Sequence, residues 1–217
     1  MFALVEPAAH EESAGEAIGR REVLANPRIR LMCGANLAFS LAVTQLETIF
    51  AFLMFDRFHY DAFQVAFVLV AMAIVMGGIQ GGGMRALSAR YPERRLLAVG
   101  SAILAAAFVF VPFAPTVALL MVPLFFCSVG RAIAQPSLMS LVSLEARPRD
   151  RGTVMGVFQS SASLARVLGP AVAGVLYDGW LAAPFFFAAA LLLFVTLLAR
   201  GFPSRELVAD PAVGAPG

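Results

Sequence analysis

Six long apolar runs, separated by short polar segments, restrict what this chain can fold into. A bilayer core about 30 Å thick requires about 20 apolar residues in each helix that crosses it. The runs have this length, and the chain is 60% hydrophobic and only 14% charged, whereas about a quarter of the residues in soluble domains are charged. The pattern predicts an all-α membrane protein, because in lipid an open chain satisfies its backbone hydrogen bonds only as helices.

We expect a bundle of six transmembrane helices, one for each run. The predicted spans cover residues 31–55, 62–83, 96–113, 116–142, 152–176 and 181–199. Residues 1–30 form a polar segment before the first span. Residues 201–217 are rich in proline and glycine, and we expect a disordered tail there. The six-helix transmembrane domain is therefore predicted to cover residues 31–200.

The distribution of arginine predicts the orientation of the bundle. Every basic residue of the chain is an arginine. The first segment, the connections after spans two and four, and the tail hold Arg28, Arg30, Arg85, Arg90, Arg94, Arg95, Arg147, Arg149, Arg151, Arg200 and Arg205. The connections after spans one, three and five hold only Arg57. The positive-inside rule then places both termini in the cytoplasm.

A glycine cluster followed by arginines marks residues 78–95. Gly81, Gly82 and Gly83 close the second apolar run, and Arg85, Arg90, Arg94 and Arg95 follow before the next run resumes at Leu96. The order predicts a membrane hairpin that turns on the cytoplasmic side. A solvated basic loop of a soluble protein is the alternative, and the apolar runs on both sides argue against it.

Three ionisable residues, Glu47, Arg131 and Arg166, fall inside predicted spans. A charge at the bilayer centre costs about 2.5–3.5 kcal/mol on insertion scales, so such residues usually face a bundle interior or a water-filled cavity. They are therefore candidates for a substrate or proton path, and a structural role is the alternative, which is favoured for Arg166. Glu47 would form a protonation-dependent ion pair with an arginine; the alternative is a purely structural pair. Polar neighbours in the spans extend the set of pathway candidates: Asn36, Gln45, Gln135 and Gln159.

Two prolines and several small residues shape spans four and five. Pro136 and Pro170 each remove a backbone donor and bend their helices. Gly169 and Gly174 stand close to Pro170, where small residues allow neighbouring helices to approach. We expect these four positions to act in helix bending and packing.

Other function classes find little support in the sequence. Both histidines lie outside the spans and the chain has no H-E-x-x-H motif, which argues against an intramembrane protease or another enzyme. Cys33 and Cys127 lie in apolar runs and are expected to be buried thiols rather than a disulfide or metal site. No basic tract suited to nucleic acid occurs. We expect no metal and no cofactor.

Three stretches of the sequence, residues 45–68, 79–100 and 128–178, together resemble one known family. They are similar to helices seven and eight, to the cytoplasmic loop between helices eight and nine, and to helices ten and eleven of the major facilitator superfamily. The similarity is to its branch of tetracycline and multidrug proton antiporters. The sequence RVLGP, from Arg166 to Pro170, is similar to the glycine-proline motif of antiporter helices.

The resemblance covers residues 31–200 and corresponds to helices seven to twelve, the C-terminal half of a twelve-helix transporter. Residues 1–30 resemble the central interdomain loop. The glycine-rich segment departs from the family pattern, because Ser88 or Ala89 stands where the N-terminal signature has an acid. That departure weakens any ion-pair latch at this loop.

The resemblance implies secondary active transport of a small organic solute, including drug/proton antiport, in a bacterial inner membrane. Substrate would bind near mid-membrane between two six-helix halves that alternate in access. Glu47, Arg131 and Gln159 would face that cavity. The partners implied are the lipid bilayer and an N-terminal six-helix half. A homodimer of this chain and a remnant that does not transport remain as alternatives.

Overall fold

Helices in this protein follow the predicted apolar runs. The computed structural model describes residues 19–202, so most of the predicted segment 1–30 and of the tail 201–217 lies outside the described residues. The helices are α1 (Arg20–Ala25), α2 (Pro27–Phe58), α3 (Ala62–Gly78), α4 (Met84–Arg90), α5 (Glu93–Phe110), α6 (Val117–Glu145), α7 (Arg151–Gly179) and α8 (Ala183–Ala199). Each of the six predicted spans falls on one long helical rod.

The predicted all-α membrane class is confirmed. In the described part of the chain, four helical stretches are long and apolar enough to cross a membrane: Pro27–Phe58, Ala62–Arg90, Glu93–Phe113 and Val117–Glu145. The helix α8 is apolar but shorter, at 17 residues, and α7 has 29 residues without belonging to this group of four.

Local side-chain chemistry sets where several helices begin and end. Asn26 accepts a hydrogen bond from the backbone of Arg28 at the start of α2, and Pro27 occupies the first helical position. At the other end of α2, His59 takes a left-handed conformation with φ 54°. The Asp61 side chain then begins α3 in a capping box with Gln64.

The prediction for residues 78–95 was wrong in one respect. The glycine cluster does not end the helix: a π-helical turn over Ile79–Gly83 carries the rod directly into α4. The break comes at Tyr91, whose φ of −130° and ψ of 139° are extended, because the following Pro92 disfavours helix for the residue before it. Continuing the helix through the glycines keeps their backbone groups hydrogen-bonded, as a lipid environment requires.

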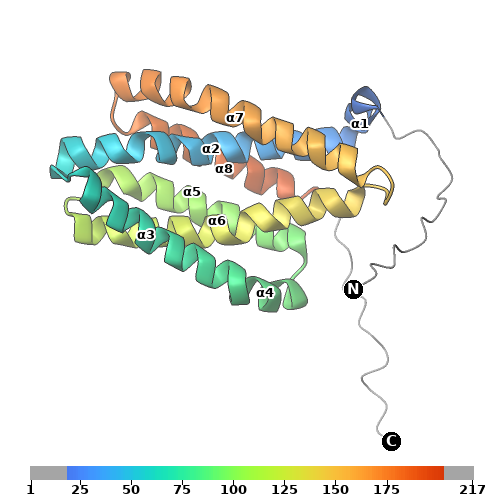
Figure 1. Ribbon diagram of the computed structural model, residues 1–217, viewed down its shortest axis with the longest axis horizontal. Coiled ribbons are helices and arrows are strands. Elements are labelled where there is room, and N and C mark those ends of the chain that lie inside the picture. Colours follow the sequence, from blue (N-terminus) through green and yellow to red (C-terminus); the bar gives the residue numbers. More distant parts are fainter. Residues whose placement is uncertain (1–18, 203–217) are drawn as a thin grey trace, which may run out of the picture.

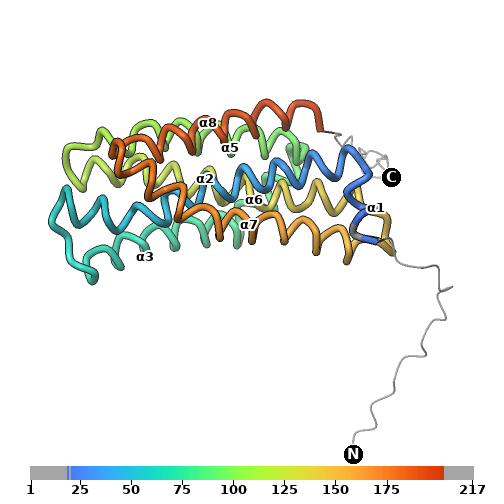
Figure 2. The backbone as a smooth tube through the Cα atoms, turned by 90° about the horizontal axis from the view of Figure 1, so that it is seen from above, coloured from blue at the N-terminus to red at the C-terminus, as the bar shows by residue number. Residues whose placement is uncertain are grey.

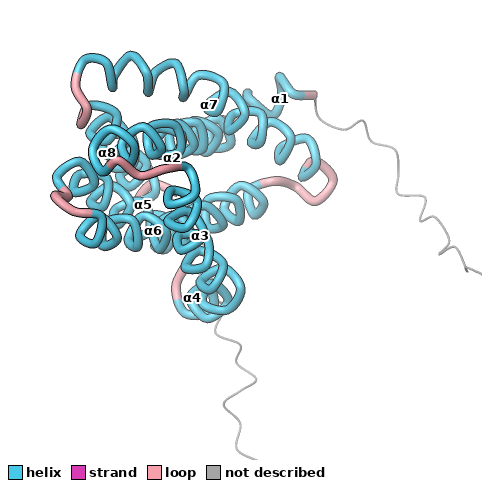
Figure 3. The backbone as a smooth tube through the Cα atoms, turned by 60° about the vertical axis from the view of Figure 1, so that its left-hand side comes forward, coloured by secondary structure: helices cyan, strands magenta, loops and turns pink. Residues whose placement is uncertain are grey.

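The long helices run side by side along the bundle (Figures 1 and 2). Helix α2 packs against α7 and α8, α5 packs against α6 and α8, and α3 packs mainly on α6. Seen toward its end, the bundle has α7 and the α3–α4 rod at opposite edges (Figure 3). Only 11% of the most apolar stretch of the α3–α4 rod is buried, compared with 61% for α2. The α3–α4 rod is therefore the least enclosed of the four membrane-length rods.

Two glycines bring the backbones of α5 and α6 into close contact. A Cβ atom on Gly130 would stand 2.7 Å from the Gly100 carbonyl oxygen and 2.8 Å from the Leu104 backbone nitrogen. A Cβ atom on Gly100 would stand 2.8 Å from the Ala134 nitrogen. Because backbone atoms cannot move aside as side chains do, both positions require glycine. Such small-residue crossings are how helices associate strongly in lipid.

We expect Gly130→Ala to destabilise the bundle, because the new methyl group would meet backbone on the facing helix. The expected loss is about 1–3 kcal/mol, as for overpacked cores. Thermal unfolding of the purified protein in detergent, followed by circular dichroism, measures it. Gly174→Ala is the matched control, since nothing lies within 4 Å of its Cβ position. Equal melting temperatures for the two variants would contradict the close contact.

Candidate substrate cavity

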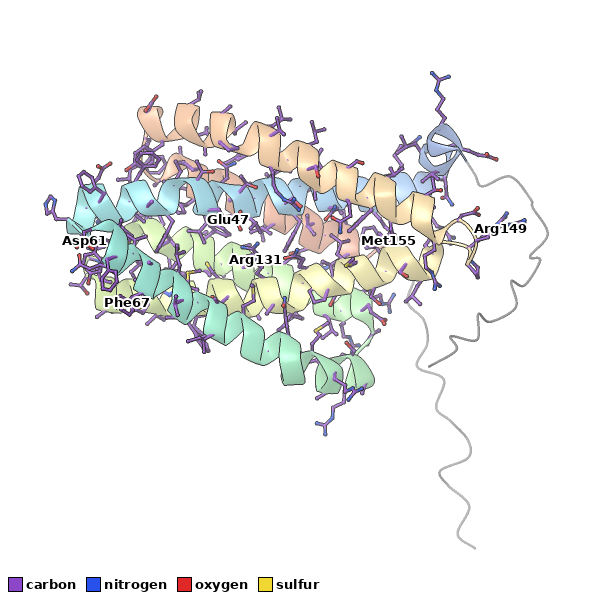
Figure 4. All side chains as sticks on the ribbon, viewed as in Figure 1. Glu47, Asp61, Phe67, Arg131, Arg149 and Met155 are labelled. Carbon is purple, nitrogen blue, oxygen red and sulfur yellow. The ribbon has the colours of Figure 1, made fainter. Side chains whose placement is uncertain are left out.

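An ion pair joins α2 to α6 at the middle of the bundle. Glu47 lies on α2 and Arg131 on α6, and the Arg131 Nη1 atom donates to Glu47 Oε1 at 2.6 Å. The two side chains lie near mid-length, far from Asp61 at one end and Arg149 at the other (Figure 4). The structure thus pairs two of the three ionisable residues that the sequence places inside spans.

The α5–α6 crossing positions Arg131. Its neighbour Gly130 is held against the backbone of α5, which fixes the rotation of α6 at this point. One residue further on, the helix turns by about 100°, and the Arg131 side chain reaches α2. The backbone that carries the guanidinium is therefore held by packing and does not depend on the ion pair.

The ion pair borders a partly open cavity of about 210 Å³ lined by α2, α3, α5 and α6. Its wall is mainly apolar, with one thiol and one hydroxyl on α6. The wall residues other than the ion pair are Val43, Leu46, Phe50, Leu69, Met72, Ala73, Met76, Leu104, Phe108, Cys127 and Ser128. The cavity combines an apolar body with a single pair of opposite charges at its edge.

Both charged side chains retain exposure to the cavity. The Glu47 side chain is 48% exposed and the Arg131 side chain 32% exposed. The Arg131 Nε atom is buried and has no hydrogen-bond partner within the described residues. A guanidinium offers five N–H donors in a planar fork, so donor capacity remains after Glu47 is bound.

Asn36 and Gln45, predicted as pathway residues, lie instead between α2 and α7. The Asn36 side chain donates to the Phe158 carbonyl oxygen at 2.8 Å and to Ser161 Oγ at 3.0 Å. Gln45 is fully buried, and its Nε2 atom lies 3.4 Å from the Gly169 carbonyl oxygen. These contacts crosslink two helices, and neither residue lines the cavity.

The remaining pathway candidates are exposed, and they also stand outside the cavity wall. Gln135 lies on α6, one turn beyond Arg131, while Gln159 and Arg166 lie on the exposed side of α7. Gly169 is buried against Thr44, whose Cγ2 atom would be 2.4 Å from a Cβ at that position. Pro136 and Pro170 both lie inside continuous helices, and Gly174 has no close neighbour.

Polar contacts join helix ends on both sides of the bundle. At one end the Tyr177 hydroxyl, just past the predicted span, donates to Asp56 at 2.9 Å. Partial burial, with this acceptor and its charge, raises the pKa of Tyr177 to about 12, so it remains a donor at neutral pH. At the other end Arg28 lies 3.4 Å from Glu145. The arginines of the glycine segment, Arg85, Arg90, Arg94 and Arg95, are exposed on α4 and the first turn of α5.

Sequence reasoning missed several residues that form the site. Met72, Met76, Cys127 and Ser128 line the cavity, but nothing in their spacing separates them from ordinary core residues. Phe50 also lines the cavity, whereas Phe39 and Phe158 are buried elsewhere in the core. Gly100 and Gly130 carried a usable signal, because an isolated glycine within a long apolar helix often marks a helix crossing.

Comparison with known proteins identifies the family. The sequence profile of the Major Facilitator Superfamily matches residues 84–215. The chain belongs to this superfamily. Major facilitator superfamily domain-containing protein 10 of Bos taurus is 34% identical over 172 residues, which cover 76% of this chain and 37% of that protein. The class B tetracycline resistance protein of Escherichia coli is 23% identical over 133 residues, 58% of this chain and 33% of that protein.

A solved structure supports the same assignment. The crystal structure of the human organic anion transporter MFSD10 (TETRAN) superposes with a TM-score of 0.74 and 27% identity. The superposition covers 79% of this chain and 40% of that one. The chain spans about a third of the length of the curated relatives it matches. The predicted superfamily, including its resemblance to tetracycline antiporters, is thereby confirmed.

We expect Asn36→Leu to weaken the α2–α7 contact by about 1 kcal/mol, since it removes two buried donors that join the helices. Chemical or thermal unfolding in detergent measures the loss. Gln159→Leu is the control, because that side chain is exposed on α7 and makes no side-chain hydrogen bond among the described residues. A loss of equal size in the control would show that Asn36 has no special role.

Proposed function

We infer that this chain carries the substrate cavity of a secondary active transporter for small organic solutes. The observation that supports this most is the Glu47–Arg131 pair, which borders an apolar cavity at mid-bundle. Ionisable residues are expensive within a bilayer and commonly mark substrate or proton paths. The expected mechanism is alternating access, in which two six-helix halves rock about a site between them.

The exposed faces of the bundle suit a second six-helix unit. The α3–α4 rod and α7 stand at opposite edges, and α3 leaves large apolar side chains such as Phe63 and Ile74 about 70% exposed. The exposed side of α7 mixes Gln159 and Arg166 with apolar residues such as Val167. We propose an N-terminal six-helix half as the partner, in another chain or in further sequence, with a second copy of this chain as the alternative.

The arginine distribution supports an orientation in the membrane. The arginine-rich connections α4–α5 and α6–α7 lie toward one end of the bundle, and the α2–α3 connection, next to the last turn of α2 that carries Arg57, lies at the other (Figure 1). We propose that the arginine-rich end faces the cytoplasm and that both termini lie there. The proposed location is the inner membrane of a bacterium.

Two substrate classes are consistent with the relatives. The similarity to a tetracycline resistance protein supports drug efflux, for which we propose proton antiport as the coupling. The relative of known structure is described as an organic anion transporter. Arg131 favours this second candidate, because a guanidinium in an apolar cavity binds carboxylates well.

We expect Glu47→Gln to abolish proton-driven transport while leaving membrane insertion intact, because an amide, unlike a carboxyl group, does not gain and lose a proton near neutral pH. Solute flux into proteoliposomes under an imposed pH gradient is the measurement, with and without a co-expressed N-terminal half. Asp178→Asn, an exposed acid beyond the predicted spans, should behave as the wild type. Undiminished transport by Glu47→Gln across pH would show that the residue is structural.

The mass of the detergent-solubilised complex tests the partner. A complex twice the mass of the chain supports the homodimer, and a monomer contradicts it. Absence of flux both with and without the first half would support a remnant that does not transport.

A further inference from the structure

The charges on the cavity wall are balanced but chemically unequal. Among the described residues that line the cavity, Glu47 and Arg131 are the charged groups. A carboxylate can accept a proton and become neutral, whereas an arginine remains charged in proteins. Only one member of the pair can therefore lose its charge inside the cavity.

Because only Glu47 can become neutral, the charge of a solute decides which side chain of the ion pair it can replace. If Glu47 takes up a proton, it releases Arg131, and an anionic solute restores the neutrality of the site. A cationic solute at Glu47 would instead leave Arg131 charged and unpaired against an apolar wall, which is strongly unfavourable. The cavity is thus suited to exchange one carboxylate for another at the guanidinium.

The geometry at Arg131 provides for a second acceptor. One guanidinium nitrogen binds Glu47 at 2.6 Å, and the Arg131 side chain remains 32% exposed, so further N–H donors can reach a second acceptor. Planar guanidinium groups bind carboxylates through two parallel N–H donors. Met72, Met76 and Phe108 lie on the same wall and offer apolar contact to the rest of a solute.

We propose that the cavity binds an organic anion with an apolar body, and that each anion binds together with one proton taken up by Glu47. The proton adds to the Glu47 carboxylate, the Arg131 N–H donors pass to the solute carboxylate, and the net charge of the site is unchanged. This proposal rests on the transport function and specifies proton–anion symport rather than antiport of cationic drugs.

Few other groups can act on Glu47. Helices α3 and α5 present only apolar side chains to the cavity. On α6 the titratable neighbours are Arg131 itself and the buried thiol of Cys127. Arg166 of α7 is exposed outside the cavity wall. A proton linked to anion binding is therefore assigned to Glu47.

Three probes that differ mainly in charge test the proposal: 2-naphthoate, 2-naphthamide and 2-naphthylmethylammonium. Their binding to the purified full chain in detergent is measured by equilibrium dialysis between about pH 6 and pH 8. Calorimetry in two buffers of different ionisation enthalpy counts the protons taken up. We expect naphthoate to bind more tightly than the other two probes. Its affinity should rise by up to about tenfold for each unit by which the pH falls, and one proton should be taken up for each anion bound.

Matched variants separate the roles of the two residues. Glu47→Gln should retain naphthoate binding but lose its pH dependence and the proton uptake. Arg131→Gln should weaken naphthoate binding by at least about tenfold, and Arg166→Gln should leave it unchanged. Circular dichroism checks that each variant is folded. Each single variant leaves one charged side chain without its partner, and the double variant Glu47→Gln with Arg131→Gln controls for the effect of that unpaired charge.

Tighter binding of the ammonium probe, anion binding without proton uptake, or no binding of any probe by folded protein would overturn the proposal. A naphthoate flux assay in proteoliposomes tests the transport function separately from anion binding. Proton-linked binding without flux, both with and without a co-expressed N-terminal half, would support the anion site and contradict transport. Flux of the ammonium probe alone would support transport and contradict the anion site.

Discussion

The contact between Gly100 and Gly130 determines much of the structure. Within a bilayer no hydrophobic force holds helices together, so close packing at small residues and interhelical hydrogen bonds must do so. Backbone atoms of α5 and α6 meet there with no room for a Cβ. Because Arg131 is the next residue, the contact that joins the two helices also orients the arginine of the cavity wall.

Helix α2 separates two kinds of polar chemistry onto opposite faces. Gln45 and Glu47 are two residues apart, which is about 200° around a helix. The Gln45 amide faces α7, where Asn36 also makes neutral hydrogen bonds to that helix. Glu47 faces the cavity and α6. One face holds the bundle together, and the other carries the groups that can change charge.

The fold could be predicted from the sequence to a large extent, because hydropathy and helix length directly reflect the bilayer. The pairing of Glu47 with Arg131 could be proposed but not established, since the two residues are separated by 84 positions and the rotation of each helix is set by packing. Asn36 and Gln45 were predicted to line a pathway, and their contacts with α7 could not be predicted from the sequence. Polarity alone cannot say whether a side chain faces water or a neighbouring backbone.

The helical continuation through Ile79–Gly83 has a mechanical consequence. At Gly77, Gly78, Gly81 and Gly82 nothing lies within 4 Å of where a Cβ would stand, and none of the five residues of the π-helical turn is buried. Bending the rod at this place disturbs little buried packing, since beyond the rod itself the turn contacts mainly α6. The turn therefore gives the arginine-bearing end of the rod, α4, a pivot whose stiffness comes mainly from backbone hydrogen bonds.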